Sequence, residues 1–406
     1  MAYKFIDGSV TAAKGFTASG VHCGIRKNKT KRDIGLIFCE KKCTAAAVYT
    51  TNLVQSSPIT ITKQNLSDGY AQAVIANSGN ANTCNADGDK KAKKMCELAA
   101  DALGISADDV IVASTGVIGQ VLPIEPIEEG VPSLVKELSV DGATDAAEAI
   151  MTTDTVKKEV AVETVIGGKT VKVGGISKGS GMIHPNMATM LCFVTTDAAI
   201  SAGMISKAVK TAADATFNMI SIDGDTSTND MLSVMASGLA GNSEITTEGE
   251  DYDAFVEALT AVCRELSKKM AKDGEGATKL LICKVSGAKT EKDAKGAAKS
   301  VICSSLLKAA MFGADANWGR VLCAIGYSGC DIDVHKVDVS FSSEKGTIDV
   351  CKNGAGIDFS EETAKDILLM DEITILVGLN DGEGTAEAYG CDLTYEYVKI
   401  NGDYRT

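Results

Sequence analysis

The chain has 406 residues, 45% of them hydrophobic, and a formal net charge of −14. This length exceeds what one small core needs, so two domains or lobes are expected. The acidic balance argues against nucleic acid or an anionic membrane as a partner, because both carry negative charge themselves.

Cysteine usage and the N-terminal residues bear on compartment and metal content. The 13 cysteines are an odd number, scattered without a Cys-x-x-Cys pair, and only three histidines are present. Such cysteines are typical of small, reduced, buried residues, so no metal site is predicted. Residues 1–8 lack the apolar core of a signal peptide, and no window approaches the ~18 apolar residues of a membrane span. We expect a cytoplasmic protein.

Strands and helices alternate along the chain. Apolar runs predict strands at residues 73–76, 110–113, 190–194, 280–285, 334–341 and 373–377. Apolar periodicity predicts helices at residues 90–103, 204–217, 251–272 and 294–311. Several strands crowd together towards the two ends of the chain, where hairpins suit better than crossovers. The predicted fold class is therefore α/β, a layered α/β/α arrangement in two lobes with mixed or antiparallel sheets.

A Gly-rich segment ending in Ala188 and Thr189 precedes the buried strand predicted at 190–194. If Thr189 Oγ attacked the Ala188 carbonyl, an N→O acyl shift and hydrolysis would cut the chain there. Thr189 would then carry a free α-amine, with a pKa of about 8, that can serve as general base for its own hydroxyl. The alternative is an ordinary β-branched residue at the start of a strand. A cut there would divide the chain into residues 1–188 and 189–406.

Eight ordered motifs carry a resemblance that spans nearly the whole chain. They are NSGNAN (77–82), STGVIG (114–119), MTTDT (151–155), KGSGMIHPNMATML (178–191), DGDTSTND (223–230), DGEGATK (273–279), NWGR (317–320) and NGDYRT (401–406). By these motifs the chain resembles the bifunctional ornithine acetyltransferase/N-acetylglutamate synthase family of arginine biosynthesis. The resemblance implies an N-terminal-nucleophile-like fold of the ornithine acetyltransferase type and self-cleavage between Ala188 and Thr189.

The resemblance also implies the reaction. An acetyl group would move from N2-acetyl-L-ornithine to L-glutamate through an acetyl-Thr189 ester, in a ping-pong cycle. By the same resemblance, Thr115 and Gly116 would form the oxyanion hole that a tetrahedral intermediate needs. Without the resemblance, Ser114–Gly119 is a plain strand–turn connection after the strand at 110–113.

Substrate contacts are implied at six positions. They are Thr152, Lys178, Thr189, Glu275, Asn401 and Thr406. Lys178, on a Gly-flanked loop, could hold a carboxylate as a compact cation, and Glu275 could face the ammonium group of ornithine. Solvated loop charge is the alternative for both. Because Thr406 is the last residue, the chain end is expected to belong to the site, unlike most termini.

Two other segments resemble ligand-binding motifs but lack residues that those motifs need. The GGKT at 167–170 lacks the leading glycine of a phosphate-binding loop, and 223–230 lacks the Gly and Glu of a calcium loop. His184 is expected to pack in the loop or face solvent. Ala13, Lys157 and Ala316 stand where the resembled family often has proline, which leaves substrate preference less certain.

Two further function classes remain as alternatives. One is a related N-terminal-nucleophile aminopeptidase or amidase, in which water resolves the acyl-enzyme. The other is a non-catalytic amino-acid-binding protein that never cleaves itself. No cofactor is predicted, and acetyl-CoA is left open as a second acetyl donor. The resemblance suggests that the two fragments assemble as a heterotetramer with two copies of each.

Overall fold

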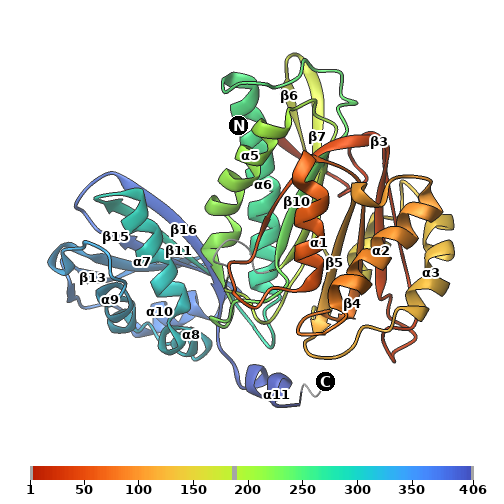
Figure 1. Cartoon of the computed structure of the whole chain (residues 1–406). Helices are drawn as coiled ribbons and strands as arrows, with labels where there is room; N and C mark the ends of the chain where they lie inside the picture. The colour runs from red at the N-terminus through yellow and green to blue at the C-terminus, as the bar shows by residue number, and fades with distance from the viewer. Residues whose placement is uncertain (1–2, 185–189, 404–406) are drawn as a thin grey trace. The chain divides into compact units, whose positions relative to one another are not determined.

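The computed structural model describes residues 3–184 and 190–403, which form two compact units, each built on its own mixed β-sheet (Figure 1). The first unit comprises Met1–Gly179, Pro185–Asn218 and Thr226–Leu266, and the second comprises Ser180–His184, Met219–Asp225 and Ser267–Thr406. Ala188, Thr189 and Thr406, three of the predicted site positions, lie outside the described residues.

The sheet of the first unit has nine strands within the described residues. In spatial order these are β1 (Tyr3–Ile6), β6 (Lys158–Ile166), β7 (Lys169–Lys178), β8 (Leu191–Thr196), β10 (Met231–Ala236), β3 (Ile34–Tyr49), β4 (Tyr70–Asn80) and β5 (Val110–Val117), with β2 (Phe16–Val21) paired to β3. Neighbouring strands are antiparallel except for β8 with β10 and β4 with β5.

Helices cover both faces of this sheet, as the alternation of buried residues requires. The helices are α1 (Ser57–Asn65), α2 (Gly88–Leu103), α3 (Glu125–Lys136), α4 (Ala143–Ala149), α5 (Ala202–Ala215) and α6 (Glu250–Lys272). In β4, Ile75 packs in a cluster with α2 and α3, whereas Val74 packs in a cluster with α4. Because successive strand residues point to opposite faces, both faces are buried. The predicted α/β/α layering is confirmed.

The second unit has a seven-stranded sheet and one large core cluster. Its strands, in spatial order, are β14 (Ala355–Gly356), β13 (Gly346–Lys352), β12 (Asp338–Ser343), β15 (Glu372–Gly378), β11 (Leu280–Ala288), β16 (Gly384–Cys391) and β9 (Ile220–Ser221). Its helices are α7 (Glu291–Cys303), α8 (Ser305–Phe312), α9 (Trp318–Gly326), α10 (Glu361–Leu368) and α11 (Tyr395–Asp403). Residues of α7, α9 and α10 share the core cluster with β11, β12 and β15.

Some element predictions were wrong in detail. The helix expected at 294–311 is two helices, α7 and α8, because Ser304 leaves the helical conformation and its hydroxyl accepts the Leu307 N–H at 3.3 Å as an N-cap. The strand expected at 334–341 begins only at Asp338. Before it, Asp333 caps a short 3-10 turn by accepting the His335 N–H at 3.0 Å.

Strand β8 bears directly on the proposed cleavage junction. All six of its residues are buried, as the sequence predicts, and it lies between β7 and β10 in the middle of the sheet. The sheet therefore draws neighbouring strands from both sides of the junction at 188–189.

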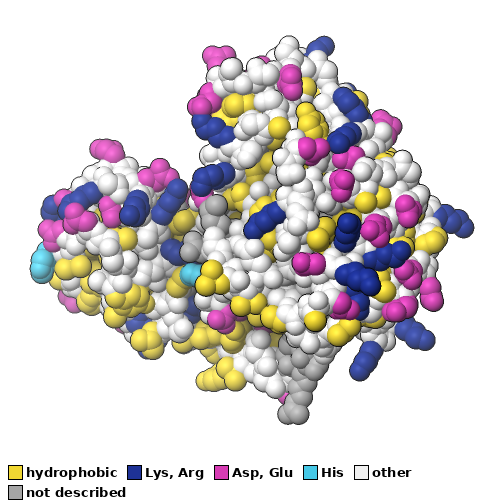
Figure 2. Space-filling view, viewed as in Figure 1, with side chains coloured by type: hydrophobic (Ala, Val, Ile, Leu, Met, Phe, Trp, Pro, Cys, Tyr) yellow, Lys and Arg dark blue, Asp and Glu magenta, His cyan; other side chains and the backbone are white. Residues whose placement is uncertain are grey.

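No helix in the described ranges is long and apolar enough to cross a membrane. Figure 2 shows acidic and basic side chains interspersed over the face in view.

Candidate functional site

Thr115 and Gly116 lie within strand β5, not in a turn after it. The prediction that the strand ends at Ala113 was wrong, because parallel pairing with β4 continues as far as Val117. The Ser114 hydroxyl donates to Asn77 Oδ1 at 2.6 Å, which joins the two strands at this point. Gly116 has a φ of 128°, and a Cβ there would lie 2.5 Å from the Gly79 carbonyl carbon. Only glycine fits this backbone position.

Lys178 is the last residue of strand β7 and is buried, with 8% of its surface exposed. Its ammonium donates to Thr115 Oγ1 at 3.3 Å. The expectation of a loop position, and the alternative of a solvated charge, were both wrong. Burial lowers the pKa of Lys178 from its ordinary value, although the carboxylates of Asp154 and Asp230 oppose this effect. The structure thus brings two predicted site residues, Thr115 and Lys178, into contact.

Asp154 connects the segment around Thr152 to the end of β7. Its Oδ1 accepts the Lys158 ammonium at 2.7 Å and the Gly179 N–H at 2.7 Å, and its Oδ2 accepts the Thr152 N–H at 2.9 Å. Burial alone would raise the pKa of Asp154, but the charges of Lys178 and Lys158 hold it below its ordinary value. Asp154 therefore stays ionised and fixes the backbone beside both Thr152 and Lys178.

A second buried carboxylate, Asp230, lies where the chain leads into β10. Burial raises its pKa well above the ordinary value, while hydrogen bonds from Ser227, Thr50 and the Met190 N–H, together with the charge of Lys178, oppose that rise. The next residue, Met231, donates its N–H to the Met190 carbonyl at 2.7 Å. Both backbone groups of Met190 are thus held by residues 230–231. We name Asp154, Lys158, Lys178 and Asp230 the buried charge cluster.

Sequence reasoning missed the two carboxyl-bearing members of this cluster, Asp154 and Asp230. Asp154 stands inside the MTTDT motif, where only Thr152 was singled out. Asp230 closes the segment 223–230, which was considered only as a calcium loop. A signal was present, because Asp230 directly precedes the apolar run 231–236, and a carboxylate at the start of a buried strand needs partners.

In the second unit, the structure brings Glu275 and Asn401 together. The Asn401 side-chain amide donates to Glu275 Oε2 at 2.7 Å. The Glu275 N–H donates to the Ser180 carbonyl at 2.8 Å. A Cβ at Gly181 would lie 2.4 Å from the Glu275 carboxyl carbon, so this glycine gives the carboxylate its space. Glu275 is partly buried, so the alternative of a fully solvated charge does not hold.

Asp223 orders the residues around Gly181 in the same unit. Its carboxylate accepts the N–H groups of Met182 at 2.6 Å and Ile183 at 2.9 Å, and the Tyr397 hydroxyl donates to it at 3.3 Å. His184 is half-buried, with Nδ1 3.1 Å from the Ser221 hydroxyl, in keeping with the expected packing role. Burial, with a contribution from Lys299, lowers the pKa of His184 to about 4.

The remaining features considered in the sequence are the three positions without the expected proline and the question of a metal site. Ala13 and Ala316, two of the three departures from the resembled pattern, are buried, whereas Lys157 is exposed. Within residues 3–184 and 190–403, no group of three or more His, Cys, Asp or Glu side chains could hold a metal ion.

The two mixed sheets, with helices on both faces of the first, place this protein in the α/β class, and its first unit holds a buried cluster of charged side chains. The chain belongs to the ArgJ family, whose model matches residues 17–406. It is 49% identical to "Arginine biosynthesis bifunctional protein ArgJ" of Caldanaerobacter subterraneus subsp. tengcongensis, over 99% of this chain and 100% of that protein.

Two solved structures are also similar. A crystal structure of ArgJ from Bacillus halodurans is 48% identical, with a TM-score of 0.50, over 52% of this chain and 98% of the solved chain. Ornithine acetyltransferase from Mycobacterium tuberculosis, complexed with ornithine, is 38% identical, with a TM-score of 0.43, over 46% of this chain and 100% of the solved chain.

Proposed function

We propose that this ArgJ-family enzyme transfers an acetyl group from N2-acetyl-L-ornithine to L-glutamate, with Thr189 as the nucleophile. The observation that carries the proposal is the contact between Lys178 Nζ and Thr115 Oγ1. Lys178 pairs across the sheet with Leu191, which follows Thr189 by two residues. A buried cation, a hydroxyl and a glycine with positive φ thus meet beside the strand to which Thr189 is attached.

The proposed reaction uses these groups in two steps. Thr189 Oγ attacks the acetyl carbonyl carbon, and the C–N bond breaks as ornithine leaves with a proton on its amine. The glutamate α-amine then attacks the ester, the C–O bond breaks, and the Thr189 hydroxyl is restored. Thr115 and Gly116 would donate hydrogen bonds to the oxyanion in both steps, and the Thr189 α-amine would carry the proton between them.

The charged residues have distinct roles in this proposal. Lys178 would hold the substrate carboxylate, since burial among apolar strands strengthens an ion pair that excludes water. Glu275 would bind the ornithine side-chain ammonium, with Asn401 fixing the carboxylate through their 2.7 Å hydrogen bond. Thr152 and Thr406 complete the proposed substrate contacts. No cofactor is needed for either step.

We propose that the free α-amine arises by self-cleavage between Ala188 and Thr189. Two observations support this proposal. The main chain at Met190 is held by residues 230–231, which favours a fixed geometry next to the scissile bond. In addition, 52% of this chain spans 98% of the solved Bacillus halodurans chain, so that polypeptide is only about half as long. A cut after residue 188 gives a fragment of about this length.

The two fragments would stay together after the cut. Strand β8 pairs with β7 on one side and β10 on the other, and β10 pairs with β3, so separation would expose the middle of a buried sheet. An assembly with two copies of each fragment, in the cytoplasm, is the form that we propose.

An isotope-labelled acetyl group tests the function directly. The purified full chain is incubated with acetyl-labelled N2-acetylornithine and glutamate, and the products are separated. We expect labelled acetylglutamate and free ornithine. Labelled acetate in place of acetylglutamate would instead indicate an aminopeptidase or amidase type of reaction. Absence of any turnover would contradict both and favour an amino-acid-binding protein.

Substitution of Thr115 by Val links this reaction to the site. Removal of one oxyanion donor should lower kcat by about 10²- to 10³-fold with little change in KM. Thr115→Ser keeps the hydroxyl and should recover most of the activity. An equal loss of kcat in Thr115→Val and Thr115→Ser would show that the Thr115 hydroxyl does not take part in the reaction.

A further inference from the structure

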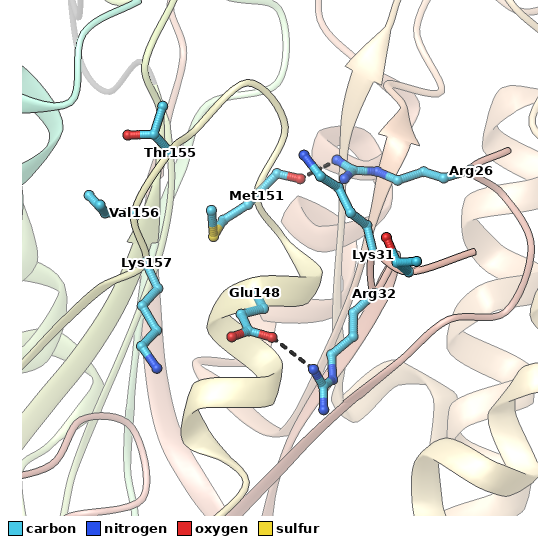
Figure 3. Close-up of a pocket in the computed structure, with 9 residues that line it drawn as sticks. Arg26, Lys31, Arg32, Glu148, Met151, Thr155, Val156 and Lys157 are labelled. Atoms are coloured by element: carbon cyan, nitrogen blue, oxygen red, sulfur yellow. Dashed lines mark hydrogen bonds and ion pairs between the residues drawn. The ribbon is translucent and has the colours of Figure 1, made fainter. Parts of the chain in front are cut away.

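A pocket of about 480 Å³ is lined only by residues of the first unit. None of the residues that we propose to bind acetylornithine is among them. Its lining includes four cationic side chains and one carboxylate, namely Arg26, Lys31, Arg32, Lys157 and Glu148. Figure 3 shows Arg26, Lys31 and Arg32 on one side of the pocket and Lys157 on the other, with Glu148 between them. In a chain with a net charge of −14, such a local excess of positive charge is distinctive.

The single lining carboxylate does not neutralise this excess. Glu148 binds one guanidinium, that of Arg32, at 2.7 Å, and Asp145 binds the same group at 2.7 Å. Within the described residues, the Lys31 ammonium has no ion-pair partner. The Lys157 ammonium lies 3.8 Å from Glu159 and 3.5 Å from the Thr144 hydroxyl, and because both distances are long for such contacts, each contributes little. The ammonium groups of Lys31 and Lys157 therefore remain available to an anion.

The size of the pocket indicates what the anion is attached to. A volume of about 480 Å³ falls within the range of pockets for small organic ligands and far exceeds a lone inorganic ion. Met151 and Val156 add apolar surface to the lining. Guanidinium groups match phosphate oxygens in a forked geometry, and lysines add point charges.

From this combination of charge, volume and lining, we propose that the pocket binds an organic phosphate that carries at least two negative charges. The phosphate groups would lie among Arg26, Lys31 and Lys157, and the organic part would lie against Met151 and Val156. This site stands apart from the acetyl transfer proposed above and does not depend on it.

Two details connect the pocket to the rest of the first unit. The Arg26 guanidinium donates to the Met151 carbonyl, next to Thr152 in the chain. Burial is the main cause of the lowered pKa of Lys178, and the charge of Arg26 adds to it.

Calorimetric titration with inorganic pyrophosphate at low salt tests the phosphate part of the proposal. We expect saturable binding that is weakened about tenfold or more by the double variant Lys31→Ala/Lys157→Ala, since two cations leave the pocket. The matched control is Lys136→Ala/Lys169→Ala, which removes two exposed lysines of the same unit outside the pocket. The affinity of this control for pyrophosphate should stay within about twofold of that of the unchanged protein, because both lysines lie outside the pocket. The net charge changes equally in the two double variants, so a general electrostatic effect would appear in both.

An equal loss of pyrophosphate affinity in the two double variants would show that binding depends only on the net charge of the protein. That result would overturn the proposal. So would the absence of saturable binding up to about 10 mM pyrophosphate. All four lysines are exposed, so both variants should fold, and a thermal melt checks this.

ADP and coenzyme A then test the organic part. Either one should bind more tightly than pyrophosphate and lose affinity in Lys31→Ala/Lys157→Ala. Affinities no better than that of pyrophosphate would overturn this part of the proposal. Tighter binding of coenzyme A than of ADP would connect the pocket to the acetyl donor that the sequence leaves open. Acetyl transfer from acetylornithine to glutamate, measured on the same variants, should be unchanged, so failure of either proposal is visible separately.

Discussion

The buried charge cluster of the first unit and the Glu275–Asn401 pair of the second unit both hold side chains that we propose to bind substrate. They differ in how far those side chains are buried. The cluster is almost completely buried, and its members are held by short hydrogen bonds and by one another. The Glu275–Asn401 pair is more exposed, and Asn401 belongs to the last helix of the chain. Because charge interactions strengthen as water is excluded, the two groups should differ in what their loss costs.

This difference in burial indicates which of the two groups is preorganised. In the cluster, orientation is fixed before a substrate arrives, since breaking a buried pair costs about 3–5 kcal/mol. In the Glu275–Asn401 pair, orientation depends on exposed hydrogen bonds of about 1 kcal/mol each. We therefore expect loss of a cluster member to lower both turnover and substrate affinity, and loss of the Glu275–Asn401 hydrogen bond to act mainly on affinity.

Lys178→Met should produce the largest effect among substitutions in these two groups. Loss of the buried cation should lower kcat/KM by about 10²- to 10³-fold, because the substrate carboxylate loses its partner in a dry site. Steady-state kinetics of acetyl transfer measures this. The matched control is Lys308→Met, another buried lysine, whose ammonium donates to the Cys391 carbonyl. That variant should lose stability and keep its turnover per folded molecule. A similar kcat/KM for both variants would contradict the role of Lys178.

Asp154→Asn should lower kcat by about 10- to 100-fold, because the backbone at Thr152 and Gly179 loses its common anionic acceptor. It should also change the pH profile. The negative charge of Asp154 raises the pKa of Lys178, so its removal lowers that pKa and moves the alkaline limb of the profile to lower pH.

The control for this prediction is Asp197→Asn, a buried carboxylate that accepts the Lys172 N–H at 2.8 Å. It should reduce thermal stability without moving the alkaline limb. A profile that stays in place in Asp154→Asn would mean that this residue has only a structural role.

Asn401→Ala should act mainly on substrate affinity. Loss of one exposed hydrogen bond to Glu275 should raise KM for acetylornithine about 3- to 10-fold and leave kcat within about twofold. Lys399→Ala, which breaks the exposed pair with Glu396 in the same helix, is the control and should leave both constants unchanged. If instead kcat fell as far as in Asp154→Asn, the contrast between the two groups would be lost.

His184→Gln should have the smallest effect, confined to stability at acidic pH. The folded-state pKa of about 4 lies below the ordinary value, so the unfolded chain binds more protons between these pH values. Stability associated with His184 is therefore present above pH ~6.5 and lost as pH falls towards 4. Melting temperatures across this range should fall less steeply in His184→Gln. His335→Gln, at an exposed histidine, should follow the unchanged protein.

Much of the architecture could be predicted from periodicity. The stripe from Phe255 to Met270 predicted α6, and the apolar run after Thr189 predicted the buried strand β8. The failures arose where one polar side chain redirected the backbone, as Ser304 and Asp333 do. Such local competition is invisible to a pattern of apolar residues.

The site was harder to predict than the fold. Motif resemblance pointed to Lys178 and Thr115, but neither the burial of Lys178 nor its contact with Thr115 follows from spacing, because 63 residues separate them. Asp154 and Asp230 were missed for a related reason. Their importance comes from partners that only the folded sheet brings together.

The most direct test of the central claim is mass spectrometry of the purified, active protein before and after addition of N2-acetylornithine. We predict two polypeptides, one of which begins with Thr189 and gains a single acetyl group when the donor is present and glutamate is absent. Glutamate should then remove that acetyl group, and Thr189→Ala should give one uncut, unlabelled chain. An intact wild-type chain that nevertheless transfers acetyl groups would contradict the account.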